Sequence, residues 1–162
     1  LIFVLTGIIS FREVYSEVDW SVIVLLGAMI PVGLALETSG GADLIANQIL
    51  RLGGGLAVWQ VLALLMAVTM LLSDIVNNAA TAVLMAPIAL SIAAGLSLSP
   101  DAFLMTVAIG ASSAFLTPIG HQSNTLVFGP GGYKFGDFWR LGLPLEIIIV
   151  AVSVPLIMHF WL

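Results

Sequence analysis

Two short polar stretches interrupt an otherwise apolar chain, and they hold the residues best suited to chemistry. The first is Ser73–Asn78 (SDIVNN) and the second is Thr117–Thr125 (TPIGHQSNT). Their polar side chains, counting Thr81 just beyond the first stretch, include Ser73, Asn77, Asn78, Thr81, His121, Gln122, Ser123, Asn124 and Thr125. Neutral oxygen-rich groups suit a dehydrated Na⁺, because hard cations prefer oxygen ligands. Amide and hydroxyl groups beside helix N-termini also suit an oxyanion.

The second stretch contains Pro118 and Gly120, which break a helix. A helix broken inside a lipid bilayer loses backbone hydrogen bonds, and no water is present to replace them. The break must therefore line a polar cavity enclosed by protein. Unwound backbone there offers carbonyl groups to a cation and helix N-termini to an anion, so we predict a transport site, or half of one.

A simpler explanation is that Asn and Ser side chains join helices in lipid, contributing about 0.6 kcal/mol each. The presence of two clusters, each at a backbone break, favours a binding site. Asp74 is expected to be the only acidic residue near the membrane interior and is a candidate proton carrier, although it could also be a helix cap or a surface carboxylate. His121 is a second candidate, since histidine exchanges protons near neutral pH; a neutral, hydrogen-bonded His121 is the alternative.

The amino-acid composition is that of a protein surrounded by lipid. Of 162 residues, 60% are hydrophobic and 8% charged, and the mean hydropathy is +1.18. With about 20 apolar residues needed per crossing, residues 1–162 form one membrane domain with room for about five or six membrane segments. The net charge of −5 supplies no basic surface for nucleic acid, and there is no cysteine. No catalytic constellation is present, so we predict neither an enzyme nor a cofactor other than a coupling ion.

The apolar runs predict the elements that position these clusters. We expect the tail of a truncated spanning helix over Leu1–Ser10, a solvated loop over Phe11–Asp19, a spanning helix over Trp20–Leu36, an interfacial helix over Ala42–Leu52 and a last helix over Phe138–Leu162. Gly40 and Gly41 are expected to end the first complete span. In the interfacial helix, apolar positions recur at helical spacing opposite Asp43 and Arg51.

The runs on either side of the first cluster, Leu56–Leu72 and Ala79–Leu98, allow two arrangements. They form either two full spans joined by a surface turn or a re-entrant hairpin with its tip near the middle of the membrane. The small residues after Asn78 and the lack of Lys, Arg or Gly in the turn favour the hairpin. Ser99 is the expected cap of the next helix, whose small residues Gly110–Ala114 would allow tight helix contact.

The few basic residues indicate how the chain is oriented in the membrane. With the hairpin in place, Arg12, Lys134 and Arg140 fall on one face of the membrane and Arg51 on the other. Basic residues accumulate on the cytoplasmic side, so the first face is predicted to be cytoplasmic.

Three segments carry a family resemblance over nearly the whole chain: VDWSVIVLLGAMIPVGLALETSGGADLIA, NNAATAVLMAPIA and TPIGHQSNTLVFGPGGYKFGDFWRLGLPL. They resemble the C-terminal half of the divalent-anion:sodium symporter family, among the citrate-transporter-like permeases of the ion-transporter superfamily. The resemblance implies an all-α membrane protein: one inverted repeat with spanning helices, an interfacial helix, a re-entrant hairpin and a broken helix, the N-terminal repeat being missing. The sequence of these segments is most similar to that of bacterial anion permeases with cytosolic regulatory domains. This similarity implies a location in the bacterial inner membrane.

The resemblance also assigns residues. The family's Ser-Asn-Thr hairpin tip corresponds to Asn77, Asn78 and Ala79, and its broken helix matches at Pro118 and Asn124, with Na⁺ near Asn78 and Asn124. The implied substrate contacts are Asn77, Asn78, Ala79, Ser123, Asn124 and Thr125; the implied ion contacts are Ser73, Asn78, Pro118, Gly120 and Asn124. The expected function is symport of a small anion, sulfate or a di- or tricarboxylate, with Na⁺ or H⁺.

Two other functions remain open at this point. One is a Na⁺/H⁺ antiporter-like carrier of the same superfamily that uses Asp74 and His121. The other is a non-transporting membrane scaffold that pairs through its small-residue face. The expected partners are the anion, the lipid bilayer, the missing repeat and a second copy in a homodimer, without nucleic acid.

Overall fold

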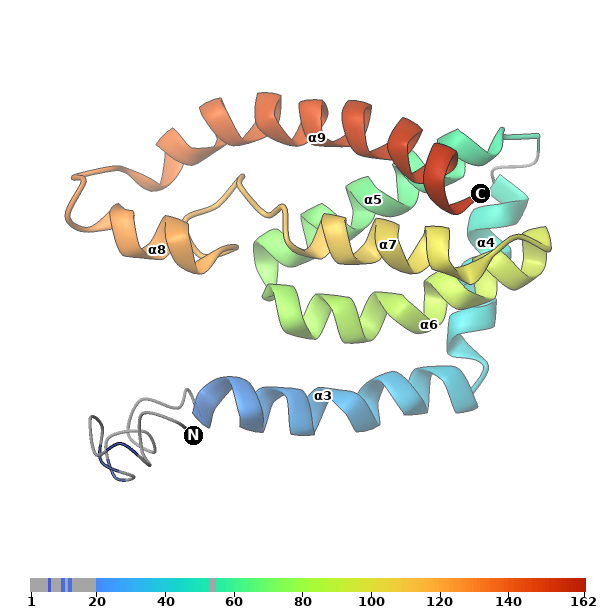
Figure 1. Ribbon diagram of the computed structural model, residues 1–162, viewed down its shortest axis with the longest axis horizontal. Helices are drawn as coiled ribbons and strands as arrows, with labels where there is room; N and C mark the ends of the chain where they lie inside the picture. Colours follow the sequence, from blue (N-terminus) through green and yellow to red (C-terminus); the bar gives the residue numbers. More distant parts are fainter. Residues whose placement is uncertain (1–5, 7–9, 11, 13–19, 53–54) are drawn as a thin grey trace.

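The chain folds into a bundle of helices in the computed structural model, which describes residues 6, 10, 12, 20–52 and 55–162 (Figure 1). No strand occurs in these ranges, and the predicted all-α class is confirmed. The elements are α3 (Trp20–Thr38), α4 (Gly41–Leu52), α5 (Val58–Ile75), α6 (Asn78–Leu96), α7 (Pro100–Ala111), α8 (Gln122–Phe128), a 3₁₀ turn η1 (Phe135–Asp137) and α9 (Phe138–Trp161). The predictions for Leu1–Ser10 and Phe11–Asp19 lie largely outside the described residues.

The hydrophobic core lies among α5, α6 and α7, with α9 packed on α5 and α7, and with α3 and α4 packed on α6. Its fully buried side chains include Leu62, Met66, Met70, Ile92 and Phe103. Many other large apolar side chains remain exposed on the outside of the bundle. A bundle that is apolar both inside and outside is expected when lipid surrounds it.

Three helices are long and apolar enough to cross a membrane: α5, α6 and the segment Phe135–Trp161. The α3–α4 pair, bent by 64°, could supply a fourth crossing. The described residues therefore hold fewer crossings than the five or six that the length allows. These helices make the chain an integral membrane protein.

Helix α3 confirms the predicted helix that begins at Trp20, and it ends where Gly40 adopts a φ of +74°. Only glycine takes this conformation at little cost, so Gly40 ends the helix, while Gly41 already opens α4. Helix α4 runs across the end of the other helices (Figure 1). It buries Ala42 and Ala46 against its neighbours and leaves Leu44, from the predicted apolar face, 72% exposed.

The two ends of the bundle differ in their basic residues. Lys134 and Arg140 flank the start of α9, and Arg51 lies in the last turn of α4. The start of α9 and helix α4 lie at opposite ends of the bundle (Figure 1). This separation agrees with the predicted division of Lys134 and Arg140 from Arg51 between the two membrane faces.

Candidate functional site

The first polar cluster forms the tip between α5 and α6. Helix α5 ends at Ile75 and α6 begins at Asn78, so only Val76 and Asn77 join them. The Asn77 side chain caps α6 by accepting a hydrogen bond from the Ala80 N–H at 2.8 Å. Asn77, predicted as a substrate contact, is therefore engaged in holding the first turn of α6.

The second cluster belongs to a break between α7 and α8, but the break is displaced from its predicted place. The non-helical backbone covers 112–121, and Gln122–Thr125 are already helical. Of the polar stretch Thr117–Thr125, only the part up to His121 is non-helical, and the break begins before the stretch, at Ser112. His121 caps α8, its Nδ1 accepting from the Ser123 N–H at 3.2 Å, and polar side chains are well tolerated in the turn that follows a cap.

Helix α7 ends early because serines compete for its backbone. The Ser112 and Ser113 hydroxyls donate to the Ala108 and Ile109 carbonyls at 2.8 and 2.7 Å. Such bonds favour departure from helical geometry. The small-residue face is used nearby, since a Cβ added at Gly110 would lie 3.0 Å from Thr69 Cβ and 3.1 Å from the Met66 carbonyl oxygen.

The hairpin tip and the break meet at Asn78. Its side-chain nitrogen, with two N–H groups, faces three acceptors: the carbonyls of Ala111 at 3.1 Å and Gly120 at 2.9 Å and Ser73 Oγ at 3.0 Å. The amide is assigned this way because its oxygen would otherwise face only acceptors. The Ser73 hydroxyl in turn donates to the Ala111 carbonyl at 2.7 Å. The structure thus joins both ends of the break to the tip of the hairpin.

Asp74 holds the middle of the break. Its Oδ1 accepts from the Leu116 N–H at 3.0 Å, and its backbone carbonyl accepts from the Thr117 hydroxyl at 2.8 Å. The hydroxyl of Thr117 also accepts from the Gly120 N–H at 3.0 Å. With 3% of its surface exposed, Asp74 is part of the buried site and not a surface carboxylate.

The α8 side of the break is held by Asn124 and Thr125. The Asn124 amide nitrogen donates to the carbonyls of Thr117 at 3.0 Å and Ala114 at 3.4 Å. The Thr125 hydroxyl donates to the carbonyl of the buried Pro118 at 2.8 Å. Asn124 therefore contacts the break through its nitrogen, whereas Ser123 is exposed on α8 and shares no side-chain bond with the tip in the described structure.

Sequence reasoning missed Glu146, and the expectation that Asp74 is the only acid near the interior is wrong. Glu146 lies in α9 with 6% of its surface exposed, and its Oε1 accepts from the Phe115 N–H at 2.9 Å. Asp74 accepts from the next backbone N–H, that of Leu116, so the two acids bind consecutive residues of the break. The missed signal was a single acid inside the apolar run LGLPLEIIIV, since an ionisable residue at membrane depth is a functional candidate by default.

The depth of the site follows from α9. Glu146 lies about 12 Å along the helix from Phe138, at a rise of about 1.5 Å per residue. Because Asp74 at the hairpin tip and Glu146 bind the N–H groups of consecutive residues, Leu116 and Phe115, the tip stops well short of the start of α9. Helix α7, with 12 residues, is about 18 Å long and too short to cross about 30 Å of hydrocarbon by itself.

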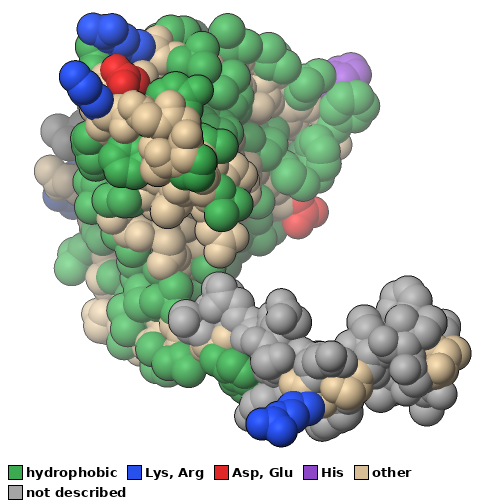
Figure 2. Space-filling model, turned by 90° about the vertical axis from the view of Figure 1, so that its left-hand side faces the viewer, with side chains coloured by type: hydrophobic (Ala, Val, Ile, Leu, Met, Phe, Trp, Pro, Cys, Tyr) green, Lys and Arg blue, Asp and Glu red, His purple; other side chains and the backbone are tan. Residues whose placement is uncertain are grey.

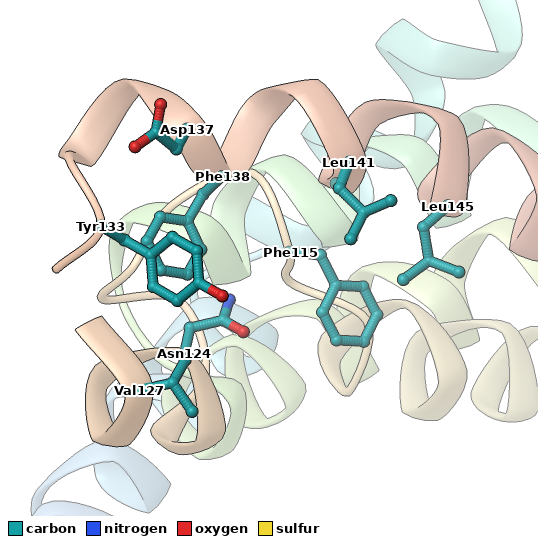
Figure 3. Close-up of a pocket in the computed structure, with 9 residues that line it drawn as sticks. Phe115, Asn124, Val127, Tyr133, Asp137, Phe138, Leu141 and Leu145 are labelled. Atoms are coloured by element: carbon teal, nitrogen blue, oxygen red, sulfur yellow. The ribbon is translucent and has the colours of Figure 1, made fainter. Parts of the chain in front are cut away.

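A pocket of about 370 Å³ opens beside the break, between α8 and α9 (Figure 3). Its lining residues are Phe115, Asn124, Val127, Tyr133, Asp137, Phe138, Leu141, Gly142 and Leu145. Most of these side chains are apolar, and the charged one is an acid. The pocket therefore offers poor chemistry for an anion, and the polar contacts of the site lie behind it, at the break.

The described residues contain no group of three or more His, Cys, Asp or Glu side chains that could hold a metal ion. The polar site instead consists of backbone and neutral side-chain oxygens around Asn78, with two carboxylates beside them. Such a site, built where a helix is interrupted inside a helical membrane bundle, defines the class of membrane proteins with discontinuous helices.

Within this class, the chain belongs to the citrate transporter family, whose model matches residues 1–162. The predicted resemblance is confirmed. The chain is 43% identical over 155 residues to an uncharacterized transporter of Synechocystis sp., covering 96% of this chain and 25% of that protein. It is 29% identical over 150 residues to sodium/sulfate cotransporter 1 of Chlamydomonas reinhardtii, covering 92% of this chain and 17% of that protein.

A mouse relative, solute carrier family 13 member 1, is 29% identical over 157 residues, which are 97% of this chain and 26% of that protein. The chain thus spans about a quarter or less of the length of these relatives. Their names are those of transporters, in agreement with the prediction that the chain is not an enzyme.

Proposed function

We propose that this chain supplies one half-site of a secondary-active symporter that couples the uptake of a small anion, sulfate or a di- or tricarboxylate, to Na⁺. The observation that carries the proposal is the set of oxygens around the Asn78 amide, which comes from the hairpin tip and from both ends of the break. The name of the Chlamydomonas sodium/sulfate cotransporter supports the same coupling ion and anion class.

The Asn78 amide can serve two states of this site. The two N–H groups of its nitrogen face three acceptors, the Ala111 and Gly120 carbonyls and Ser73 Oγ. If the Asn78 amide group rotates by 180°, its own oxygen joins the oxygens of Ala111, Gly120 and Ser73. A cation would then take the place of the amide hydrogens as the partner of these oxygens. Four neutral oxygens suit a weakly held Na⁺, which must be released again during transport.

The re-entrant arrangement of α5 and α6 is part of the proposal. Two surface-to-surface spans would place the tip at the membrane face where α9 begins. Asp74 and Glu146 bind the neighbouring N–H groups of Leu116 and Phe115, and Glu146 lies about 12 Å along α9, which supports a tip within the hydrocarbon layer. Backbone that is broken at this depth requires polar partners from protein, and the tip provides them.

The anion would be held beside the cation. Its proposed contacts are the predicted ones at the tip and on α8: Asn77, Asn78, Ala79, Ser123, Asn124 and Thr125. Since the chain spans about a quarter of its relatives' length, the other half-site would come from an N-terminal repeat, with alternating access between repeats. We further propose a homodimer in the bacterial inner membrane.

The test is uptake of sulfate, succinate or citrate by the full-length protein in proteoliposomes, with a Na⁺ or a choline gradient. Asn78→Ala should abolish Na⁺-driven uptake or raise the Na⁺ concentration for half-maximal uptake by at least about tenfold, because it removes a buried partner of three polar groups. Asn47→Ala, at an exposed position of α4, is the matched control and should behave as wild type. Unchanged uptake by Asn78→Ala would exclude the site.

A Na⁺/H⁺ antiporter-like carrier is the second candidate, and the burial of Asp74 beside the break favours it. His121, the other residue predicted for this role, caps α8 through its Nδ1. The two candidates differ in their need for an anion. Proton efflux driven by inward Na⁺, in liposomes without any transported anion, would support the antiporter and contradict the symporter.

A further inference from the structure

Two carboxylates from different helices grip adjacent peptide groups in the middle of the break. Glu146 on α9 accepts from the Phe115 N–H at 2.9 Å, and Asp74 on α5 accepts from the Leu116 N–H at 3.0 Å. Each bond pairs a backbone N–H of the break with a carboxyl oxygen that is itself buried. The break is therefore fixed both to the hairpin and to α9.

The opposite side of the same peptide groups is also fixed. In a trans peptide the N–H and the preceding C=O point in opposite directions. The Ala114 carbonyl, opposite the Phe115 N–H, accepts from Asn124 at 3.4 Å. The Phe115 carbonyl, opposite the Leu116 N–H, lies against Gly142 so closely that a Cβ there would clash with it. These peptide planes therefore have little freedom to rotate.

The bonds of Asp74 to the break also fix Gly120, whose carbonyl Asn78 contacts. A Cβ added at Gly120 would lie only 2.9 Å from Asp74 Oδ1, and the Gly120 N–H donates to Thr117, which is bonded to the Asp74 carbonyl. Displacing the centre of the break would thus displace one of the oxygens around Asn78.

The arrangement is costly, which argues that it is not merely packing. Asp74 Oδ2 is buried without a hydrogen-bond partner in the described structure, and a buried polar atom left unpaired costs free energy. No ion pair with Lys or Arg relieves these acids within the described ranges. An apolar residue on α9 would avoid the desolvation of a carboxyl group, but it could not accept a hydrogen bond from the Phe115 N–H.

We infer that Glu146 is a positioning residue for the cation site, which it holds through the Phe115 peptide and without touching the ion. The inference rests on the proposed function. It predicts that Glu146 sets the affinity for Na⁺ more than it sets the stability of the fold.

Na⁺ alone is the probe in the test, which measures the thermal stabilisation of the full-length protein by NaCl against choline chloride. Glu146→Leu should raise the apparent Kd for Na⁺ by about tenfold. Glu146→Gln keeps a side-chain oxygen for the Phe115 N–H and should stay within about threefold of wild type. The matched controls Glu37→Leu and Glu37→Gln, at an exposed position of α3, should leave the Kd unchanged.

Two results would overturn the inference. One is a lower melting temperature of Glu146→Leu with an unchanged Kd, which would assign Glu146 a structural role only. The other is an equal rise of the Kd in both Glu146 variants, which would mean that the charge matters and the hydrogen bond does not. If Glu146→Leu fails to fold, Gly142→Ala displaces the same peptide with both acids intact and should raise the Kd in the same way; an unchanged Kd would contradict the inference.

Failure of the proposed function gives a different result. If Na⁺ does not stabilise the wild-type protein, the proposed cation site is wrong. Amide hydrogen exchange over 112–121 then tests, without Na⁺, whether Glu146 fixes the backbone of the break. Faster exchange in Glu146→Leu than in Glu146→Gln would support the positioning role, and equal exchange in the two would overturn it.

Discussion

The two halves of the broken helix have opposite environments. Helix α7 packs on α5, α6 and α9 and buries half of its length, including the fully buried Phe103. Helix α8 has no buried residue, and its Leu126 is 74% exposed. The end of the molecule that includes α8 presents mainly hydrophobic side chains with few charged ones (Figure 2). The environment of α7 is thus complete within this chain, whereas that of α8 depends on what surrounds the chain.

The difference separates two roles for one discontinuous element. The α7 half is a rigid support that places the Ala111 carbonyl at the tip of the hairpin. The α8 half contacts the site through Asn124 and Thr125, which bond the break. We expect substitutions in α7 to act on stability and equivalent ones in α8 to leave the fold nearly unchanged.

The largest contrast is expected between Phe103→Ala and Leu126→Ala. The first change opens a cavity in the core and should cost about 3–5 kcal/mol of unfolding free energy. The second removes an exposed side chain and should stay within about 0.5 kcal/mol of wild type. Denaturant titration of the full-length protein in mixed micelles measures both. Similar losses for the two variants would show that α8 is packed as tightly as α7.

An intermediate contrast is expected between Gly110→Ala and Gly129→Ala. The added methyl group at Gly110 would press on Thr69 and the Met66 carbonyl, so it should destabilise the protein by about 1–3 kcal/mol. At Gly129, which ends α8, nothing lies within 4 Å and φ is −70°. The methyl group there should be neutral or stabilise by about 0.4–1 kcal/mol. A loss at Gly129 would indicate an unseen neighbour of α8.

The smallest effect is expected at the cap of α8. His121→Ala removes the acceptor for the Ser123 N–H and should cost about 0.5–1 kcal/mol. His121→Asn restores a capping side chain and should recover most of the loss, as measured by the same titration. If Asn fails to restore stability, the contact of the His121 ring with Phe115, at a centroid distance of 6.1 Å, matters more than the cap.

The sequence predicted most of the fold because apolar runs and caps act locally. Ser99 caps α7 as predicted, accepting from the Asp101 N–H at 3.4 Å. The sequence also predicted the two polar clusters that the structure brings together, since Asn78 and Gly120 lie within hydrogen-bond distance. The boundaries of the break could not be predicted, because polar residues such as Gln122 read as loop although they form the first turn after a cap.

Glu146 could not be paired with Asp74 from sequence, because their contact depends on how α9 packs against α5. Pairings between helices far apart in the chain are set by tertiary packing and not by local pattern. A single acidic residue in an apolar run is nevertheless a candidate for a functional test, and Glu146 is such a residue.

The two-residue link between α5 and α6 limits how the hairpin can move. With Asn77 already capping α6, the link has no slack that would let the two helices spread apart. Any displacement of Asn78 during a transport cycle must carry both helices together, as one hinged body. Spin labels placed across α5 and α6 should keep their separation in every state, while labels joining α6 to α9 should report the motion.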